Sequence, residues 1–350
     1  MRLAERAGRL EPAAGATIRL AVAIFKTSSP HPAPDPVLIL GGGPGQALLQ
    51  TVGPIRLLNR DLILLDQRGA GYSQPSLRCL DNETPQACHS RLVKSGINLN
   101  AFTTLQNAAD VHALIRALGY KQVNLDGISY GTRLALTVMR LYPADLGNVV
   151  LNSVLPPQVN VFTSIPQAAA QAFDVLFQGC AADPYCKTTY PHLQAVFYQL
   201  VADLNRSPIA FQATSSSGQS VTVRFTGNRL VWWLQQSLYS ASLIPVLPAV
   251  IFQIRQHDYT QLASIYGDLI DDTMSWGLFY SVMCGEDAAF TTQRALETSV
   301  QGLAPQIRPA LLDLSMSWFS VCQFGDESGP CGTEGASHEQ HSDADLARRV

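Results

Sequence analysis

The chain has 350 residues, of which 47% are hydrophobic and 15% charged, and its formal net charge is −3. This length suits one large domain with an insertion, or two domains, and the composition is that of a soluble globular protein. A net charge so close to zero gives no reason to expect nucleic acid or an anionic membrane as a partner. The most apolar run, residues 243–254, is too short to span a bilayer and holds two prolines.

Short segments rich in apolar or β-branched residues predict strands at 17–25, 37–40, 61–65, 122–125 and 148–152. Amphipathic patterns predict helices over Thr104–Leu118, which Gly119 closes, and over Thr132–Tyr142, which Pro143 ends. Strands that alternate with helices indicate an α/β fold, with a mostly parallel sheet covered by helices on both faces.

After Pro157 the pattern changes. Residues 158–275 are mostly helical in pattern, with a turn at 215–218 between two strand-like pieces, which indicates a helical cap inserted into the sheet. Its Trp232 and Trp233 line a substrate cavity or simply pack between cap helices. The apolar run Phe279–Cys284 predicts a strand, and 303–319 a helix. We therefore divide the chain into a first part of the core (1–157), a cap (158–275), a return to the core (276–324) and an atypical tail without ordered structure (325–350).

Six of the seven cysteines fall into pairs along the chain: Cys79 with Cys88, Cys180 with Cys186, and Cys284 with Cys322. Cys331 is left over. None of the pairs has the C-x-x-C spacing of a metal site, so we interpret them as disulfides, with free buried thiols as the alternative. Disulfides favour a secreted or periplasmic protein. Residues 1–15, however, carry charges where a signal peptide needs an apolar stretch.

The most informative motif is the pentapeptide Gly127–Gly131, which reads G-x-S-x-G between a predicted strand and a predicted helix. This is the pattern of a nucleophile elbow, where a strained turn exposes the serine hydroxyl above a helix N-terminus. We therefore take Ser129 as the candidate catalytic nucleophile. The alternative is a glycine-rich turn that contains an incidental serine.

Acyl transfer by a serine also needs an oxyanion hole. In such an elbow one donor is the backbone N–H of the residue after the nucleophile, here Tyr130, and the other comes from a glycine loop after an earlier strand. The loop Gly41–Gly45 follows the predicted strand 37–40, and we choose Gly43 as the second donor, with Gly42 as the alternative. A tight turn or a phosphate cradle is the other interpretation, but no G-x-x-x-x-G-K-[ST] motif is present.

Four segments in this order resemble the prolyl aminopeptidase and tripeptidyl-aminopeptidase-like α/β-hydrolases: GGGPG (41–45), DQRGAGYS (66–73), GISYGT (127–132) and YSVMCGED (280–287). The resemblance runs from about Thr17 to Phe324. It departs from the family at Gly41, where the family loop usually has histidine. The resemblance implies an α/β-hydrolase fold and export.

The resemblance also implies that Glu286 binds the free α-amino group of a substrate, with Asp287 as the neighbour to test beside it. An ordinary surface carboxylate is the alternative for Glu286. We expect Asp66 and Arg68 to brace the fold rather than to touch substrate.

An α/β-hydrolase places its triad in the order Ser, Asp or Glu, His. Asp326 with His338 or His341 has that order, but the separation is short for a strand–helix–strand connection, and the remaining candidates, Asp271, Asp272 and Asp313, are weaker. A shifted reading frame of the codons for 338–350 permits a strand-like string that resembles the family's strand before the catalytic acid. We therefore expect that the last strands are absent through truncation or a frameshift. An export signal and a further N-terminal strand are also expected to be missing.

These features predict a serine hydrolase that removes N-terminal residues from short peptides through an acyl-enzyme on Ser129, with no metal or organic cofactor required. Two alternatives stay open: a carboxylesterase on the same scaffold, and a catalytically impaired, truncated hydrolase that only binds ligand. The expected partner is a small peptide or ester substrate, and the sequence does not indicate an oligomeric state.

Overall fold

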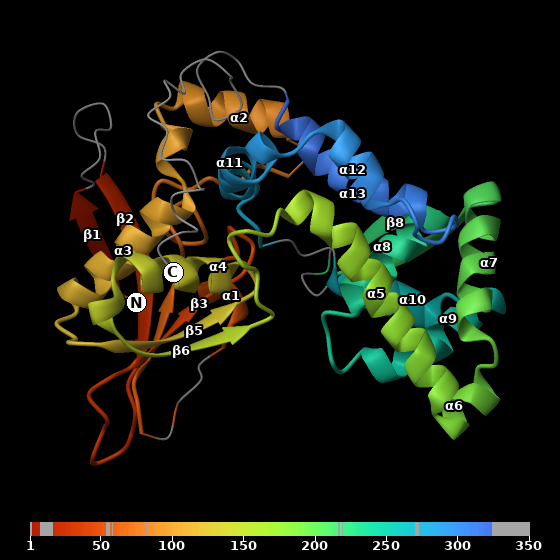
Figure 1. Cartoon of the computed structure of the whole chain (residues 1–350), viewed down its shortest axis with the longest axis horizontal. Coiled ribbons are helices and arrows are strands. Elements are labelled where there is room, and N and C mark those ends of the chain that lie inside the picture. Colours follow the sequence, from red (N-terminus) through yellow and green to blue (C-terminus); the bar gives the residue numbers. More distant parts are fainter. Residues whose placement is uncertain are drawn as a thin grey trace.

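The computed structural model describes residues 2–7, 17–53, 57, 59–81, 83–215, 218, 220–269 and 273–323. Within them, a six-stranded sheet has the strand order β1-β2-β4-β3-β5-β6 (Figure 1). Its strands are β1 (Arg2–Ala7), β2 (Thr17–Phe25), β3 (Val37–Leu40), β4 (Leu62–Leu65), β5 (Val123–Ile128) and β6 (Leu146–Asn152). β3 runs parallel to β4 and β5, and β5 to β6, while β2 is antiparallel to β1 and β4. The predicted mostly parallel sheet is confirmed.

The parallel register brings the sequence motifs to one edge of the sheet. Leu40 pairs with Gly127, and Ile128 pairs with Asn152, so β3, β5 and β6 end side by side. The glycine loop, the serine turn and the segment after β6 therefore leave from the same edge. Carboxyl ends of parallel strands are where α/β folds bind their ligands.

Helices cover the sheet and bury its apolar side chains. They are α1 (Leu48–Thr51), α2 (Pro85–Lys94), η1 (Leu99–Ala101), α3 (Thr104–Ala117), α4 (Tyr130–Leu141) and η2 (Pro143–Asp145). α4 packs on β3, β5, β6 and α3. All four residues of β4 are buried, which explains why its sequence is continuously apolar rather than alternating.

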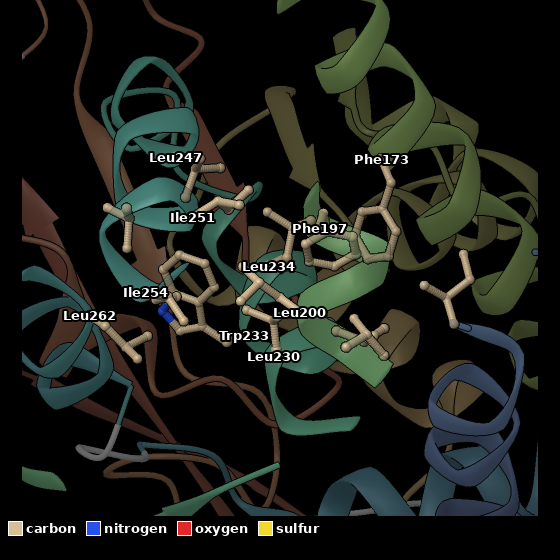
Figure 2. Close-up of a cluster of buried hydrophobic side chains, with 14 of the residues drawn as sticks. Phe173, Phe197, Leu200, Leu230, Trp233, Leu234, Leu247, Ile251, Ile254 and Leu262 are labelled. Atoms are coloured by element: carbon tan, nitrogen blue, oxygen red, sulfur yellow. The ribbon is translucent and has the colours of Figure 1, made fainter. Parts of the chain in front are cut away.

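The chain after Pro157 forms a second, mainly helical region. Its elements up to residue 269 are α5 (Val161–Ala182), α6 (Pro184–Thr189), α7 (Leu193–Arg206), β7 (Ile209–Thr214), β8 (Ser220–Phe225), α8 (Gly227–Ser237), η3 (Ile244–Val246), α9 (Leu247–Arg255) and α10 (Thr260–Asp268). β7 and β8 pair antiparallel, as the turn at 215–218 predicted. The region has its own hydrophobic cluster, in which Trp233 is fully buried beside residues such as Phe197 and Ile251 (Figure 2).

The last described elements return toward the sheet: α11 (Trp276–Glu286), η4 (Ala288–Phe290), α12 (Gln293–Ser299) and α13 (Arg308–Val321). Figure 1 shows α12 and α13, in blue, reaching from α11 back to the second region. Ile307 and Leu311 join the cluster of that region, so α13 packs with the helices before residue 275. The proposed division at 157 and 275 stays a prediction.

Two local predictions are wrong. Phe279–Cys284 lies inside α11 and is not a strand, because a short apolar run fits a fully buried helix as well as a buried strand. The further N-terminal strand is present as β1, paired with β2. The predicted helix over 303–319 exists as α13 but begins at Arg308.

The three predicted disulfides are confirmed: Cys79–Cys88, Cys180–Cys186 and Cys284–Cys322. The third joins the end of α11 to the residue that follows α13. Cys331 and the tail 325–350 lie outside the described residues. Within the part of the chain that is described, no helix has both the length and the apolar character needed to cross a bilayer.

Candidate active site

Ser129 lies on a sharp turn between β5 and α4, as predicted. Its backbone angles are φ 56° and ψ −123°, a conformation that costs a residue with a side chain about 1–3 kcal/mol. Neighbouring groups hold the turn in place. The N–H of Ser129 donates to the carbonyl of Asn152 at 3.0 Å, and the hydroxyl of Thr132 donates to the carbonyl of Ser129 at 2.6 Å. The surrounding fold therefore fixes a half-buried serine at the edge where the parallel strands end.

Gly131 is required because the helix after the serine packs directly on the end of β3. A Cβ at this position would lie 1.9 Å from the carbonyl oxygen of Leu40, far inside contact distance. A Cβ on Gly127 would lie 2.6 Å from the carbonyl oxygen of Gly131. The two outer glycines of the motif therefore permit the close packing that an elbow needs.

The glycine loop after β3 passes beside the serine. A Cβ built on Gly42 would lie 3.3 Å from the Cβ of Ser129. Gly43 is exposed, and its φ of 106° is a value that only glycine adopts readily. The N–H of Gly42 donates to Oε1 of Gln46 at 3.0 Å, so this alternative donor is already engaged. Gly43 is thus the better candidate in the loop.

Tyr130 is the first residue of α4. A backbone N–H at this position has no carbonyl within its own helix to bind, and it carries the positive end of the helix dipole. The amide that follows Ser129 is therefore suited to stabilise an oxyanion. The side chain of Tyr130 is buried, and its burial raises the pKa of the phenol, so the hydroxyl stays protonated.

Glu286 ends α11 and lies against the start of α3. Its Oε1 accepts from the backbone N–H of Thr104 at 2.6 Å, and its Oε2 accepts from the hydroxyl of Thr104 at 2.6 Å. The hydroxyl of Thr104 is also 2.8 Å from the hydroxyl of Tyr130. Burial raises the pKa of the Glu286 carboxyl, while the bonds from Thr104 oppose that rise. Glu286 is therefore no ordinary surface carboxylate, since two hydrogen bonds connect it to the residue after Ser129.

Asp287 points elsewhere and has a structural role. Its carboxylate forms a buried ion pair with Arg133 of α4 at 2.6 Å and accepts from the N–H of Val161 at 2.9 Å. The side chain of Asn160 donates to its carbonyl oxygen at 2.7 Å. Asp287 therefore ties α11 to α4 and to the start of α5, and it is not free for a substrate.

Asp66 and Arg68 brace the fold, as expected. The carboxylate of Asp66 accepts from the N–H groups of Leu49 and Tyr72, both at 2.9 Å, and burial raises its pKa. Arg68 makes a two-pronged, buried ion pair with Asp110 at 2.7 and 2.8 Å. These contacts hold the loop after β4 to α1 and α3.

The described histidines do not complete a triad with Ser129, because none of them forms a hydrogen bond with its hydroxyl. His112 pairs with Asp145 and stacks on Tyr142, but Asp145 precedes β6 and so lies at the opposite edge of the sheet. Asp313 lies on α13 and accepts from Asn228. The other candidates, Asp271, Asp272, Asp326, His338 and His341, are outside the described residues.

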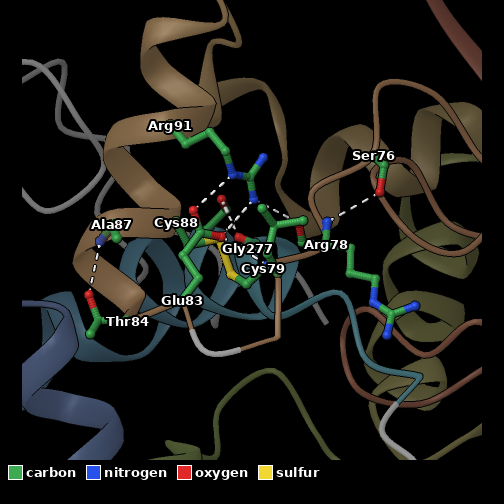
Figure 3. The surroundings of a disulfide bond; sticks show 11 residues. Ser76, Arg78, Cys79, Glu83, Thr84, Ala87, Cys88, Arg91 and Gly277 are labelled. Carbon is green, nitrogen blue, oxygen red and sulfur yellow. Dashed lines mark hydrogen bonds and ion pairs between the residues drawn. A yellow bond between two sulfur atoms is a disulfide. The ribbon is translucent and has the colours of Figure 1, made fainter.

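Among the described residues, one cluster has ligand atoms close enough for a metal ion, namely Cys79, Glu83 and Cys88. Its two thiols are joined in a disulfide, and Glu83 accepts two hydrogen bonds from Arg91, each at 2.8 Å (Figure 3). A metal site needs free thiolates and a free carboxylate, so this cluster is structural.

The comparisons with known proteins show to which family the chain belongs. Residues 35–256, more than half of the chain, match the model of the alpha/beta hydrolase fold family, and the chain belongs to that family. Solved structures at 15% identity include an alpha/beta hydrolase from Novosphingobium aromaticivorans DSM 12444, with a TM-score of 0.29 over 65% of this chain and 70% of that one.

Three curated relatives share part of the chain. "Putative hydrolase YuaR" of Escherichia coli (strain K12) is 26% identical over 56% of this chain and 44% of its own length. The tripeptidyl aminopeptidase of Streptomyces lividans is 28% identical over 41% of this chain and 33% of its own length. The proline iminopeptidase of Xylella fastidiosa (strain 9a5c) is 32% identical over 35% of this chain and 34% of its own length. The sequence-based resemblance is confirmed, while the chain spans less than half the length of each of these relatives.

Sequence reasoning missed three residues that shape the site: Thr104, Arg133 and Gln46. Thr104 binds Glu286, which is 182 positions away in the sequence, and Arg133 binds Asp287, which is 154 positions away. No local sequence pattern predicts contacts over such separations. Gln46 directly follows the glycine loop and lies four residues from its partner Gly42. This closeness in the sequence could have identified Gln46 as a residue that supports the loop.

Proposed function

We propose that this protein is a serine hydrolase that removes N-terminal residues from short peptides through an acyl-enzyme on Ser129. The observation that carries the proposal is the strained turn of Ser129, beside the exposed Gly43 and at the N-terminus of α4. In this role a general base takes the proton of the Ser129 hydroxyl as its oxygen attacks the scissile carbonyl, and the N–H groups of Tyr130 and Gly43 receive the developing oxyanion. The base returns the proton to the leaving amine, and water then hydrolyses the acyl-enzyme. The relatives named as a tripeptidyl aminopeptidase and a proline iminopeptidase support the peptide class of substrate.

Glu286 supplies the selectivity for a free N-terminus in this proposal. A carboxylate next to the nucleophile binds an ammonium group through charge-assisted hydrogen bonds, which are stronger than neutral ones. Hydrogen bonds from Glu286 to Thr104, and from Thr104 to the phenolic hydroxyl of Tyr130, support this role, because Tyr130 directly follows Ser129. In the proposal, a peptide whose α-amino group binds Glu286 presents to Ser129 a peptide bond that lies a few residues from its N-terminus.

We also propose that the protein acts outside the cytoplasm. Three disulfides connect the described cysteines, and such bonds persist in oxidising compartments. Nucleic acid and membrane surfaces are not part of the proposed function, which needs a small peptide and no cofactor.

The test compares three chromogenic substrates: a tripeptide p-nitroanilide with a free amine, its N-acetylated form, and a p-nitrophenyl ester. The proposal predicts cleavage of the free-amine peptide in preference to the acetylated one, and loss of all cleavage in Ser129→Ala. Cleavage of the ester with equal treatment of the two peptides would instead indicate a carboxylesterase. No cleavage of any substrate by the folded wild-type protein would contradict both.

A further inference from the structure

Thr104 connects two parts of the candidate site that lie on different elements. It begins α3, whereas Glu286 ends α11. Its backbone N–H and its hydroxyl each donate to one oxygen of the Glu286 carboxylate, both at 2.6 Å. One threonine therefore fixes the position and the plane of that carboxylate.

The same hydroxyl fixes Tyr130. A threonine hydroxyl has one proton, and the ionised Glu286 can only accept, so the proton of Thr104 goes to Glu286. The 2.8 Å contact between the two hydroxyls is then a bond that Tyr130 donates and Thr104 accepts. Hydrogen bonds thus run from Tyr130 to Thr104 to Glu286, and they begin at the residue whose backbone N–H lies beside Ser129.

We infer that Thr104 is a positioning residue, which aims the carboxylate of Glu286 at a substrate's free α-amino group and locks Tyr130 in the elbow. The inference rests on the proposed function, from which it takes the amine site. Each carboxylate oxygen accepts about two hydrogen bonds, and Thr104 uses one on each, so capacity remains for an ammonium group. The other charged groups near Glu286, Arg133 and Asp287, bind each other.

A purely structural role makes a different prediction. A carboxylate at the N-terminus of a helix stabilises that helix without any ligand, and Glu286 has that position on α3. If capping were its whole role, loss of the Thr104 hydroxyl would lower stability and leave ligand preference unchanged. The ratio of affinities for free-amine and N-acetylated peptides therefore separates the two roles.

The experiment measures this ratio by calorimetry in a Ser129→Ala background, where no turnover occurs, with Ala-Ala-Ala p-nitroanilide and its N-acetyl form. We expect Thr104→Val to reduce the preference for the free amine about tenfold, which is the usual effect of losing a hydrogen bond to a charged group. Thr104→Ser keeps the hydroxyl and should keep the preference. Glu286→Gln keeps an oxygen for the backbone N–H of Thr104 but lacks the charge, and should abolish the preference.

Thermal melting of each variant shows whether it is folded, and Thr104→Cys, a much weaker donor, replaces Thr104→Val if the latter does not fold. An unchanged ratio in the folded Thr104 variant, or no preference in the parent, would overturn the inference. Labelling of wild-type Ser129 by a fluorophosphonate tests the hydrolase proposal separately. A labelled Ser129 without amine preference leaves the hydrolase standing and removes the inference. If Ser129 is not labelled but the amine preference depends on Thr104, the inference stands and the hydrolase proposal is removed.

Discussion

The sheet region and the helical region after Pro157 are held together in different ways. Around Ser129 the decisive contacts are between backbone atoms, such as the approach of Gly131 to the carbonyl of Leu40. In the helical region, side chains surround the fully buried Trp233. Its close backbone approaches, of Gly227 to the carbonyl of Val201 and of Gly267 to that of Thr214, join its own helices and strands and hold no strained residue of this kind. Backbone contacts fix a geometry more sharply than packing of adaptable side chains, so the sheet edge is suited to hold a strained nucleophile.

The two regions meet at the end of α11, where polar contacts add to a small hydrophobic cluster that includes Met283 and Phe162. Glu286 bonds to Thr104, and Asp287 pairs with Arg133 and binds the start of α5. The Cys284–Cys322 disulfide fixes the same end of the helix to the residue after α13. The proposed amine site therefore lies on a short segment that also helps to connect the two regions.

The largest effect is expected at this connection. Asp287→Asn should lower the free energy of unfolding by about 3–5 kcal/mol, because it leaves the buried Arg133 without a charged partner. Asp203→Asn, which breaks the exposed pair with Arg206 in the helical region, is the matched control and should cost less than about 1 kcal/mol. Urea unfolding measures both, and equal effects would show that the regions are not joined through Asp287.

A backbone clash in the elbow should have the next largest effect. Gly131→Ala places a Cβ where the carbonyl oxygen of Leu40 lies, and such overpacking costs about 1–3 kcal/mol or more. The variant should also lose cleavage or labelling at Ser129, since the helix must move away from β3. A melting temperature and a reactivity equal to wild type would refute the packing described for this turn.

The affinity for a free-amine peptide should depend on pH through Glu286. Burial raises the pKa of this carboxyl above its ordinary value of 4.5, and only the ionised form binds an ammonium group. Affinity should therefore fall as the pH drops through the raised pKa, by about tenfold per unit below it. The Glu286→Gln variant should bind the free-amine peptide weakly at every pH, without this pH-dependent fall in affinity. Calorimetry over the pH range in which the protein stays folded measures the profile, and a midpoint below 4.5 would contradict the described burial.

A glycine in the helical region should show the smallest effect, with the opposite sign. Gly179 lies inside α5, and no other part of the described structure comes within 4 Å of a Cβ built there. Gly179→Ala should therefore raise the free energy of unfolding by about 0.5–1 kcal/mol, because alanine loses less conformational entropy in a helix. Urea unfolding tests this, and destabilisation would show that α5 is more tightly packed than described.

The sequence predicted most of the sheet region because its patterns are local. The run Leu62–Leu65 reads as a buried parallel strand, and the elbow motif between strand and helix located Ser129. β1 escaped prediction because RLAERA is charged and has no β-branched residue. α11 was taken for a strand because its run from Phe279 to Cys284 is apolar on every side, which removes helical periodicity.

The surroundings of the site were less accessible to sequence reasoning. Glu286 and Asp287 are adjacent, yet Asp287 forms a buried ion pair with Arg133, whereas Glu286 accepts hydrogen bonds from Thr104. Nothing in the local sequence distinguishes the two carboxylates. Their roles depend on Arg133 and Thr104, which fold toward them from distant elements. Long-range partners of this kind have no signature in a single sequence.

The central claim is that the turn at position 129 presents a reactive serine, and labelling with a fluorophosphonate tests it most directly. Ser153 is a matched control, because it also has a positive φ, of 57°, and is exposed, but it follows β6 and has no glycine motif. The account predicts one adduct, located on Ser129 by mass spectrometry, which persists in Ser153→Ala and disappears in Ser129→Ala. A folded wild-type protein that carries no adduct on Ser129, or that is labelled equally at Ser153, would contradict it.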